Sequence, residues 1–163
     1  MWASMVLFLS LSAAQADRFT VYLSAPTRDG FVDTSKDIQD SIKDIRGRLA
    51  SMKEFQIVDS REKADVVLTV VTRGVGSQAY GQRLSYTEYY NNAVLTSLPV
   101  VANTYWVATV MEVGSYRKEF SGAYTHQYAY SMGAWGECAK QLANDVRAWA
   151  KANASQLKQR RPQ

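Results

Sequence analysis

The longest apolar and β-branched run of the chain after its first residues is ADVVLTVVTRGVG, at 64–76. Both alternating faces of its first half are apolar or threonine, which is typical of a strand covered on two sides. We therefore expect a central strand over 66–71, with helices over one face or both. The strand should end or bend where Arg73, Gly74 and Gly76 follow, because glycine weakens a strand interior.

Two other stretches have the apolar period of a helix. In the first, apolar residues recur at spacings of three and four, at Ile38, Ile42, Ile45, Leu49 and Met52. This predicts an amphipathic helix that begins near Asp33 and is capped by Asp33 or Thr34. The same spacing predicts a second helix to about Ala152, and it connects Trp135, Cys138, Ala139, Leu142, Val146 and Trp149.

Strand signals fill the intervals between these helices. They lie at 19–23, 55–58, 105–113 and 116–124, and the last two are joined by a tight turn at Gly114 and Ser115. Residues 77–104 mix tyrosines with polar residues and show no steady period, so we expect a long hairpin or lobe there. The predicted fold is α+β: one mixed or mostly antiparallel sheet of about four to five strands, packed by two amphipathic helices in the order β-α-β-β-lobe-β-β-α.

The first residues predict export. Residues 1–16 carry no charge, and they hold the apolar run VLFLSL and then AAQA, in which Ala14 and Ala16 occupy the small-residue positions of a signal-peptide cleavage site. Residues 17–157 would then form one domain, and 158–163 a basic tail. No cysteine follows the cleavage site to accept a lipid. We expect a periplasmic or secreted protein without stable membrane insertion.

Net charge and cysteine content further restrict the classes of function that the chain can have. The net charge is +4, but Lys158, Arg160 and Arg161 sit together in the tail, so the rest of the chain is close to neutral. This argues against a nucleic-acid binder, which carries its basic residues as a patch on a folded face. Cys138 is the only cysteine, so no internal disulfide can form. Its place in the apolar stripe predicts a buried, inert thiol.

No catalytic or metal-binding constellation stands out. The string RGVGSQAYG has the glycines of a phosphate loop, but no helix signal and no lysine-serine pair follow it. His126 is the sole histidine, and with one cysteine it leaves a transition metal short of nitrogen and sulfur ligands. We expect no catalytic residues, no cofactor and no metal. A hydrolase that uses His126 as its base stays as an alternative.

Tyrosine is the one compositional oddity, with ten in the chain. Tyrosines on a half-wet surface can bind glycan, peptide or protein, or they can roof the edge of a small sheet. A small-ligand or glycan carrier, with a pocket under the lobe, is a further alternative. We assign Trp106, Trp135 and Trp149 to the core. The predicted partner-binding residues are Arg73, Tyr80, Arg83, Tyr86, Tyr89 and Tyr90.

The order of the predicted elements, with FTVYL, the helix from Asp33, REKADVVLTV and the closing GAWGECAKQLANDV, resembles a known family. It is similar to small periplasmic α/β domains such as the N-terminal domain of the Tol-Pal translocation protein. The resemblance implies a non-catalytic module that contacts an envelope protein or glycan. The segment YGQRLSYTEYYNNAVLTSLP has no counterpart in that family, so no partner-binding residue is carried over.

Overall fold

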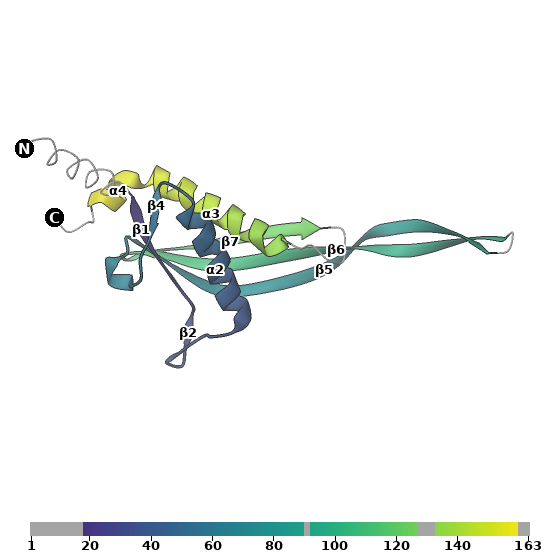
Figure 1. Ribbon diagram of the computed structural model, residues 1–163, viewed down its shortest axis with the longest axis horizontal. Coiled ribbons are helices and arrows are strands. Elements are labelled where there is room, and N and C mark those ends of the chain that lie inside the picture. Colours follow the sequence, from purple (N-terminus) through teal and green to yellow (C-terminus); the bar gives the residue numbers. More distant parts are fainter. Residues whose placement is uncertain (1–17, 90–91, 127–132, 160–163) are drawn as a thin grey trace, which may run out of the picture.

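The computed structural model describes residues 18–89, 92–126 and 133–159, and only the backbone of 80–99 and of Lys158. Five strands form one mixed sheet in the order β4-β1-β5-β6-β7, and the helices lie against one of its faces (Figure 1). The strands of this sheet are β1 (Phe19–Ser24), β4 (Phe55–Ile57), β5 (Val66–Tyr89), β6 (Asn92–Val113) and β7 (Tyr116–His126). This architecture confirms the predicted α+β class.

The remaining elements surround that sheet. A small hairpin of β2 (Thr27–Arg28) and β3 (Phe31–Val32) forms a second, two-stranded sheet. The helical elements are α2 (Lys36–Ala50), the short 3₁₀ helix η1 (Arg61–Lys63), α3 (Ala134–Ala152) and α4 (Ala154–Gln159). The predicted signal peptide, 1–16, lies outside the described residues.

One half of the sheet is parallel and the other antiparallel. β1 pairs in parallel with β4 and with β5, in the registers Phe19↔Phe55 and Val21↔Val66. The β1–α2–β4 unit is therefore the βαβ start that the sequence predicts. β5, β6 and β7 are antiparallel neighbours, and Gly114 and Ser115 form the turn that the Val113↔Tyr116 pair closes. Gly114 has φ 58°, the left-handed conformation that a tight hairpin turn favours.

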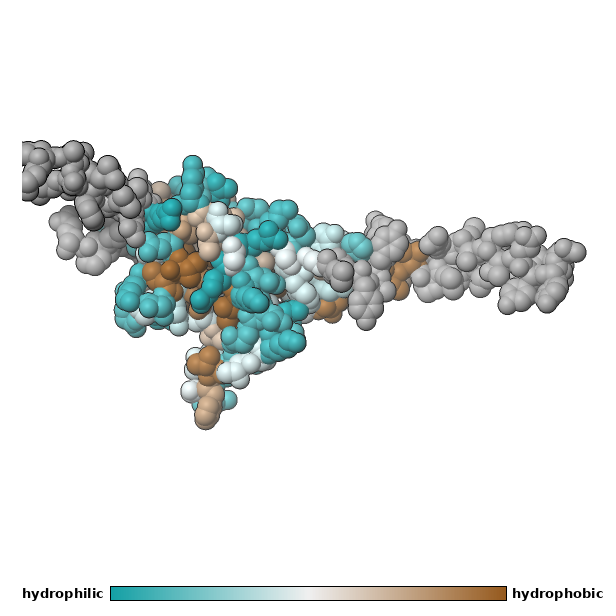
Figure 2. All heavy atoms as spheres, in the orientation of Figure 1, coloured by the Kyte–Doolittle hydropathy of each residue, from teal (hydrophilic) through white to brown (hydrophobic). Residues whose placement is uncertain are grey.

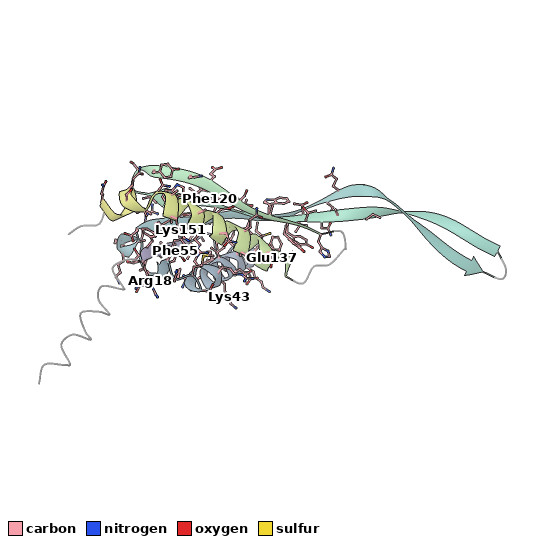
Figure 3. All side chains as sticks on the ribbon, turned by 90° about the horizontal axis from the view of Figure 1, so that it is seen from above. Arg18, Lys43, Phe55, Phe120, Glu137 and Lys151 are labelled. Carbon is pink, nitrogen blue, oxygen red and sulfur yellow. The ribbon has the colours of Figure 1, made fainter. Side chains whose placement is uncertain are left out.

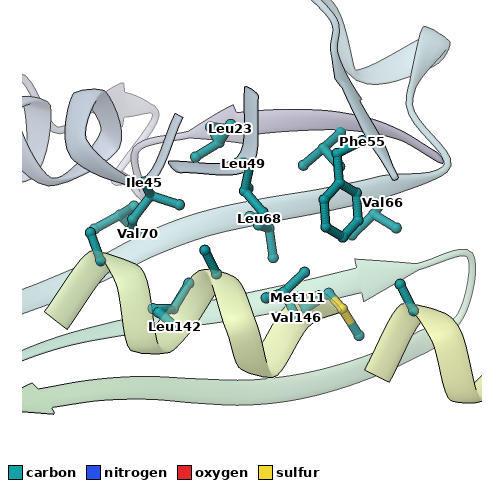
Figure 4. Close-up of a cluster of buried hydrophobic side chains, with 14 of the residues drawn as sticks. Leu23, Ile45, Leu49, Phe55, Val66, Leu68, Val70, Met111, Leu142 and Val146 are labelled. Carbon is teal, nitrogen blue, oxygen red and sulfur yellow. The ribbon is translucent and has the colours of Figure 1, made fainter. Parts of the chain in front are cut away.

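The core lies between the two long helices and the sheet (Figure 4). The apolar stripes of the two helices face the sheet. The stripe of α2 contributes Ile45 and Leu49, and that of α3 contributes Leu142 and Val146. They pack against Leu68, Val70 and Met111 of β5 and β6, and all seven side chains are fully buried. Burying one such side chain contributes roughly 1.5–3 kcal/mol. The described core is thus built from the predicted stripes.

Cys138 lies in this core, as predicted. Its side chain is fully buried in α3, and the thiol donates a hydrogen bond to the backbone oxygen of Tyr105 at 3.3 Å. Burial raises the pKa of the Cys138 thiol, which lowers the fraction of reactive thiolate at neutral pH.

The predicted cap of the first helix was wrong. The N-cap residue is Ser35, and it makes no side-chain capping bond. Asp33 lies two residues before Ser35, and its Oδ1 accepts a hydrogen bond from the Ser35 amide at 2.8 Å. This bond lowers the pKa of Asp33. The carboxylate therefore shapes the turn before the helix instead of satisfying an amide of its first turn.

The central strand, which was expected to end or bend at Gly74 and Gly76, does not end there. β5 shifts register between Val70 and Thr72, which is a bulge, and then continues through both glycines. The half-buried Trp106, directly opposite Gly74 in β6, lies over this backbone, and a Cβ at Gly74 would collide with its indole ring. The glycines make room for a ring, so Trp106 lies on the sheet and outside the core cluster.

The C-terminal segment is more ordered than the sequence predicts. The second helix was predicted to about Ala152, but α4 follows directly, and its Leu157 is 3% exposed. Leu157 joins the core cluster, which fixes this last turn of helix to the body.

Candidate functional site

The predicted lobe at 77–104 consists of the continuing strands β5 and β6. β7 ends at the pair Asn103↔His126, whereas β5 and β6 stay paired from Gln78↔Ala102 to Tyr89↔Asn92. We call residues 78–89 and 92–102 the arm, and the rest of the described chain the body. At about 3.3 Å per residue, the arm is roughly 35–40 Å long.

The arm extends away from the helices and from the rest of the sheet. Figures 1 and 3, which are related by a rotation of 90°, both show a twisted two-stranded ribbon running out from the body. β1 pairs with β5 only as far as Thr69, and β7 pairs with β6 only as far as Asn103. No described strand therefore covers either long edge of the arm.

Most of the predicted binding residues belong to this arm. Tyr80 sits at a second register shift of β5, between Ala79 and Gly81, and Arg83 is opposite Leu98. Tyr86 is opposite Leu95, and Tyr89 is opposite Asn92 in the last described pair. The structure describes the backbone of these four residues, while Tyr90 lies outside the described residues.

Arg73 does not share the surface of the arm. Its side chain is 12% exposed and faces the helices, with its guanidinium carbon 3.8 Å from the centre of the Trp135 ring of α3. Its Nη1 donates to the backbone oxygen of Asp37 in α2 at 3.3 Å, and its Nε lies 3.8 Å from the Asp37 carboxylate. Arg73 thus ties β5 to both helices just before the arm begins.

Polar contacts fix the root of the arm. Ser77 donates to Asn103 across β5 and β6 at 2.6 Å, and the hydroxyls of Thr104 and Thr125 are 3.0 Å apart across β6 and β7. These bonds hold the three strands together where β7 stops. The arm is therefore held at a defined point of the sheet.

The described tyrosines outside the arm help to roof the body. Tyr105 meets Trp135 edge-to-face at 5.0 Å, and Tyr116 stacks on Trp149 at 5.6 Å. Contacts of this kind contribute roughly 0.5–1.5 kcal/mol beyond the area that they bury. At these positions the tyrosines cover the ends of α3.

His126, the base of the alternative hydrolase, is placed at the end of β7. Its ring stacks on Tyr124 with 6.0 Å between the centroids, and it is opposite Asn103. In the described part of the chain, no group of three histidine, cysteine or carboxylate residues could hold a metal ion. The His126 ring therefore has the aromatic ring of Tyr124 as a neighbour.

A hollow that the sequence did not indicate lies on the body. It has a volume of about 550 Å³ and is lined by β1, the β2–β3 hairpin, one side of α2, and the ion pair of Arg61 with Glu112. Its position does not match the predicted pocket under the lobe.

Comparison with known proteins finds similarity in structure only. No family model matches the chain, and neither does any curated protein. A hypothetical protein from Chlamydia trachomatis has a TM-score of 0.35 and 10% identity, over 83% of this chain and 97% of the other. A candidate lipoprotein from Caulobacter crescentus has a TM-score of 0.36 and 10% identity, over 94% and 99%. Scores this low carry no argument about function.

Among the described helices, none combines the length and the apolar character that crossing a membrane requires.

Proposed function

We propose that this protein is a non-catalytic, exported envelope protein that acts as a binding or assembly module through its arm. The observation that carries the proposal is the run of pairs from Gln78↔Ala102 to Tyr89↔Asn92, which continues past the ends of both neighbouring strands. The apolar run and AAQA within residues 1–16 support export.

Physical chemistry gives the arm a reason to bind. A two-stranded ribbon is only marginally stable in water, because it has no third strand or helix to pack against. Proteins usually protect a long open edge with charged side chains, above all lysine. Residues 89–111, which include the β6 half of the arm, contain no charged residue, and Pro99 is the one edge-blunting residue there. A partner that covers the ribbon would supply the missing contacts.

The tyrosines give the arm its recognition chemistry. Tyr80, Arg83, Tyr86 and Tyr89 lie on the β5 strand of the arm, and Tyr90 follows them in the sequence. Tyrosine offers a large contact area with few rotatable bonds and one hydroxyl, which suits an envelope protein or a glycan. The similarity of the element order to the Tol-Pal N-terminal domain supports the same class of role by analogy.

The test is capture by immobilised protein. Detergent-extracted envelope proteins and, separately, purified peptidoglycan are incubated with wild-type protein and with the double variant Tyr86→Ala, Tyr89→Ala. If the arm binds, the double variant loses capture of the partner while its melting temperature stays nearly unchanged, because exposed substitutions usually change stability by at most about 0.5 kcal/mol.

A matched control uses a tyrosine of the body. Tyr116→Ala removes the stacking contact with Trp149, so it should lower the melting temperature and leave capture intact. Capture by the double variant at wild-type level, or an equal loss of capture in Tyr116→Ala, would contradict the proposal.

A further inference from the structure

Trp106 lies on the face of the sheet that no described helix covers. Its neighbours in β6 face α3, because Tyr105 meets Trp135 of that helix edge-to-face and Val107 belongs to the core cluster. Successive side chains of a strand point to opposite faces, so Trp106 points away from α3. Figure 3 shows both long helices on one side of the sheet, and Figure 2, which views that side, shows mainly hydrophilic side chains over them. The indole therefore belongs to the other surface of the body.

The indole lies flat on the backbone of β5. A Cβ at Gly74 would collide with three atoms of its six-membered ring, and one at Gly76 would come within 3.3 Å of the same ring. The two glycines thus form a seat that holds the ring close to the strand. No ring contact of the described residues involves Trp106, and its side chain is only half-buried. One face of the indole rests on the glycines, and the other is left at the surface.

Hydroxyl groups stand on both sides of this ring. Residues opposite one another in neighbouring strands share a face of the sheet, as do alternate residues of one strand. This places Thr72 and Ser121 on one side of Trp106, and Thr104 and Thr125 on the other. The two pairs flank positions 108 and 104 of β6, which are about 13 Å apart. We call Trp106 with these four residues the Trp106 platform.

The surroundings of the indole are neutral. The described residues next to it on this face are all alanine, glycine, serine or threonine: Thr72, Gly74, Gly76, Thr104, Ala108, Ser121, Ala123 and Thr125. Arg73, which precedes Gly74, points to the opposite face, where it lies over Trp135. A charged ligand would lose hydration here without gaining an opposite charge. The platform therefore favours a neutral ligand over a nucleic acid or an acidic peptide.

We propose that the Trp106 platform binds a neutral glycan. A sugar ring has one apolar face of C–H groups and a rim of hydroxyls. The apolar face lies on the indole, and the rim exchanges hydrogen bonds with the hydroxyls of Thr72, Ser121 and Thr125, which are exposed. A proline-rich peptide also packs flat on an indole, but it offers few groups to these hydroxyls. The platform lies on the body, so the proposal does not rest on the arm.

The experiment is isothermal titration calorimetry with two neutral oligosaccharides, chitotriose and cellotriose. We expect saturable binding of at least one of them, with an affinity that changes less than about twofold between about 50 and 500 mM NaCl, because no charge takes part. Ala123→Arg places a long side chain directly opposite Trp106, where it covers the indole without removing it from its seat. This variant should weaken binding by about tenfold or more.

A matched control adds the same charge elsewhere on the same hairpin. Ser115→Arg changes an exposed residue of the turn between β6 and β7, away from the platform, and should leave the affinity within about twofold. Equal affinities of Ala123→Arg and wild type, no saturable binding of either sugar, or binding that disappears at high salt would each overturn the proposal.

Tryptophan fluorescence then places the sugar on the indole. The bound oligosaccharide should change the emission of wild type but not that of Trp106→Phe, because Trp135 and Trp149 belong to α3 on the opposite face. An emission change that persists in Trp106→Phe would overturn the proposal. The arm variant Tyr86→Ala, Tyr89→Ala should bind the oligosaccharide as wild type does, whether or not it captures an envelope partner. The two proposals therefore fail separately, and loss of oligosaccharide binding in the arm variant would contradict this one.

Discussion

The body and the arm share two strands but differ in what stabilises them. Along β5, Val66, Leu68 and Val70 are fully buried under two helices, whereas the same strand from Gln78 onward has only β6 beside it. In the body, apolar burial and close packing hold the strand pairs. In the arm, the contacts that the structure describes are the pairs between β5 and β6. The difference separates a part with a packed core from a part whose described contacts are the pairs between its own two strands.

The largest effect should come from a glycine of the body. A Cβ at Gly122 in β7 would collide with the backbone carbonyl of Cys138 in α3, and a helix backbone cannot give way as a side chain can. We expect Gly122→Ala to lower the free energy of unfolding by about 3 kcal/mol. Urea denaturation measures it. Gly47→Ala, where the structure has open space on a helix, should instead stabilise by roughly 0.5–1 kcal/mol.

The next effect concerns the carboxylate that fastens α3 to the start of β4. Burial alone would raise the pKa of Glu54, but hydrogen bonds from Arg147 at 2.6 and 2.9 Å and the ammonium of Lys151 at 3.1 Å outweigh it and lower the pKa to about 2. The folded pKa lies below the ordinary 4.5, so this stabilisation is present above pH 4.5 and is lost as pH falls toward 2.

Glu54→Gln should therefore lower the free energy of unfolding by about 2 kcal/mol at pH 7. This is less than the full pKa shift implies, because both cations are partly exposed. Unfolding measured between pH 7 and pH 2 should show the gap between wild type and variant closing below pH 4.5. A gap that stays constant over that range would contradict the assignment.

A smaller effect is expected at the boundary of body and arm. Arg73→Met keeps the length of the side chain but removes the cation over Trp135. It should lower the free energy of unfolding by about 1 kcal/mol. Asp37→Asn removes only the partner carboxylate, which is 75% exposed, and should cost less than about 0.5 kcal/mol. Thermal denaturation of both variants compares the ring contact with the ion pair. Equal losses would show that the ion pair dominates.

The smallest effect should follow from removing the arm itself. A variant in which residues 79–101 are replaced by Asn-Gly joins Gln78 to Ala102 through a two-residue hairpin turn. Because the described body contacts lie outside this segment, the free energy of unfolding should change by less than about 1 kcal/mol. Circular dichroism during heating checks it. A large loss would mean that the arm packs on the body.

Local periodicity predicted the elements of the body well. The stripes with Ile45 and Leu142 became the buried faces of α2 and α3, and the tight turn at Gly114 and Ser115 is where the structure has it. These features depend on neighbours in sequence, so a single sequence reveals them. The cap at Ser35 was missed because several capping residues stand in a row there.

The features that sequence could not predict depend on distant residues. Gly74 was interpreted as a place where the strand ends or bends, and only the position of Trp106 in β6 explains this glycine. Arg73 was expected on the binding surface because it lies near the tyrosines in sequence, but the bulge after Val70 turns it toward Trp135. The hollow beside β1 is lined by residues of β1, α2, η1 and β6, which only the fold brings together.

The two-residue turn between β6 and β7 has a consequence for the order of folding. Its pairs join residues close in sequence, and such hairpins form in about 1–10 μs. The β1–β5 pairs instead join residues 45 apart, such as Ser24 and Thr69, and they close more slowly. The core also needs Leu142 and Val146 of α3. A nascent chain therefore cannot complete its core until most of its length has been synthesised, and until then the apolar faces of β1 and α2 lack the α3 side chains that cover them.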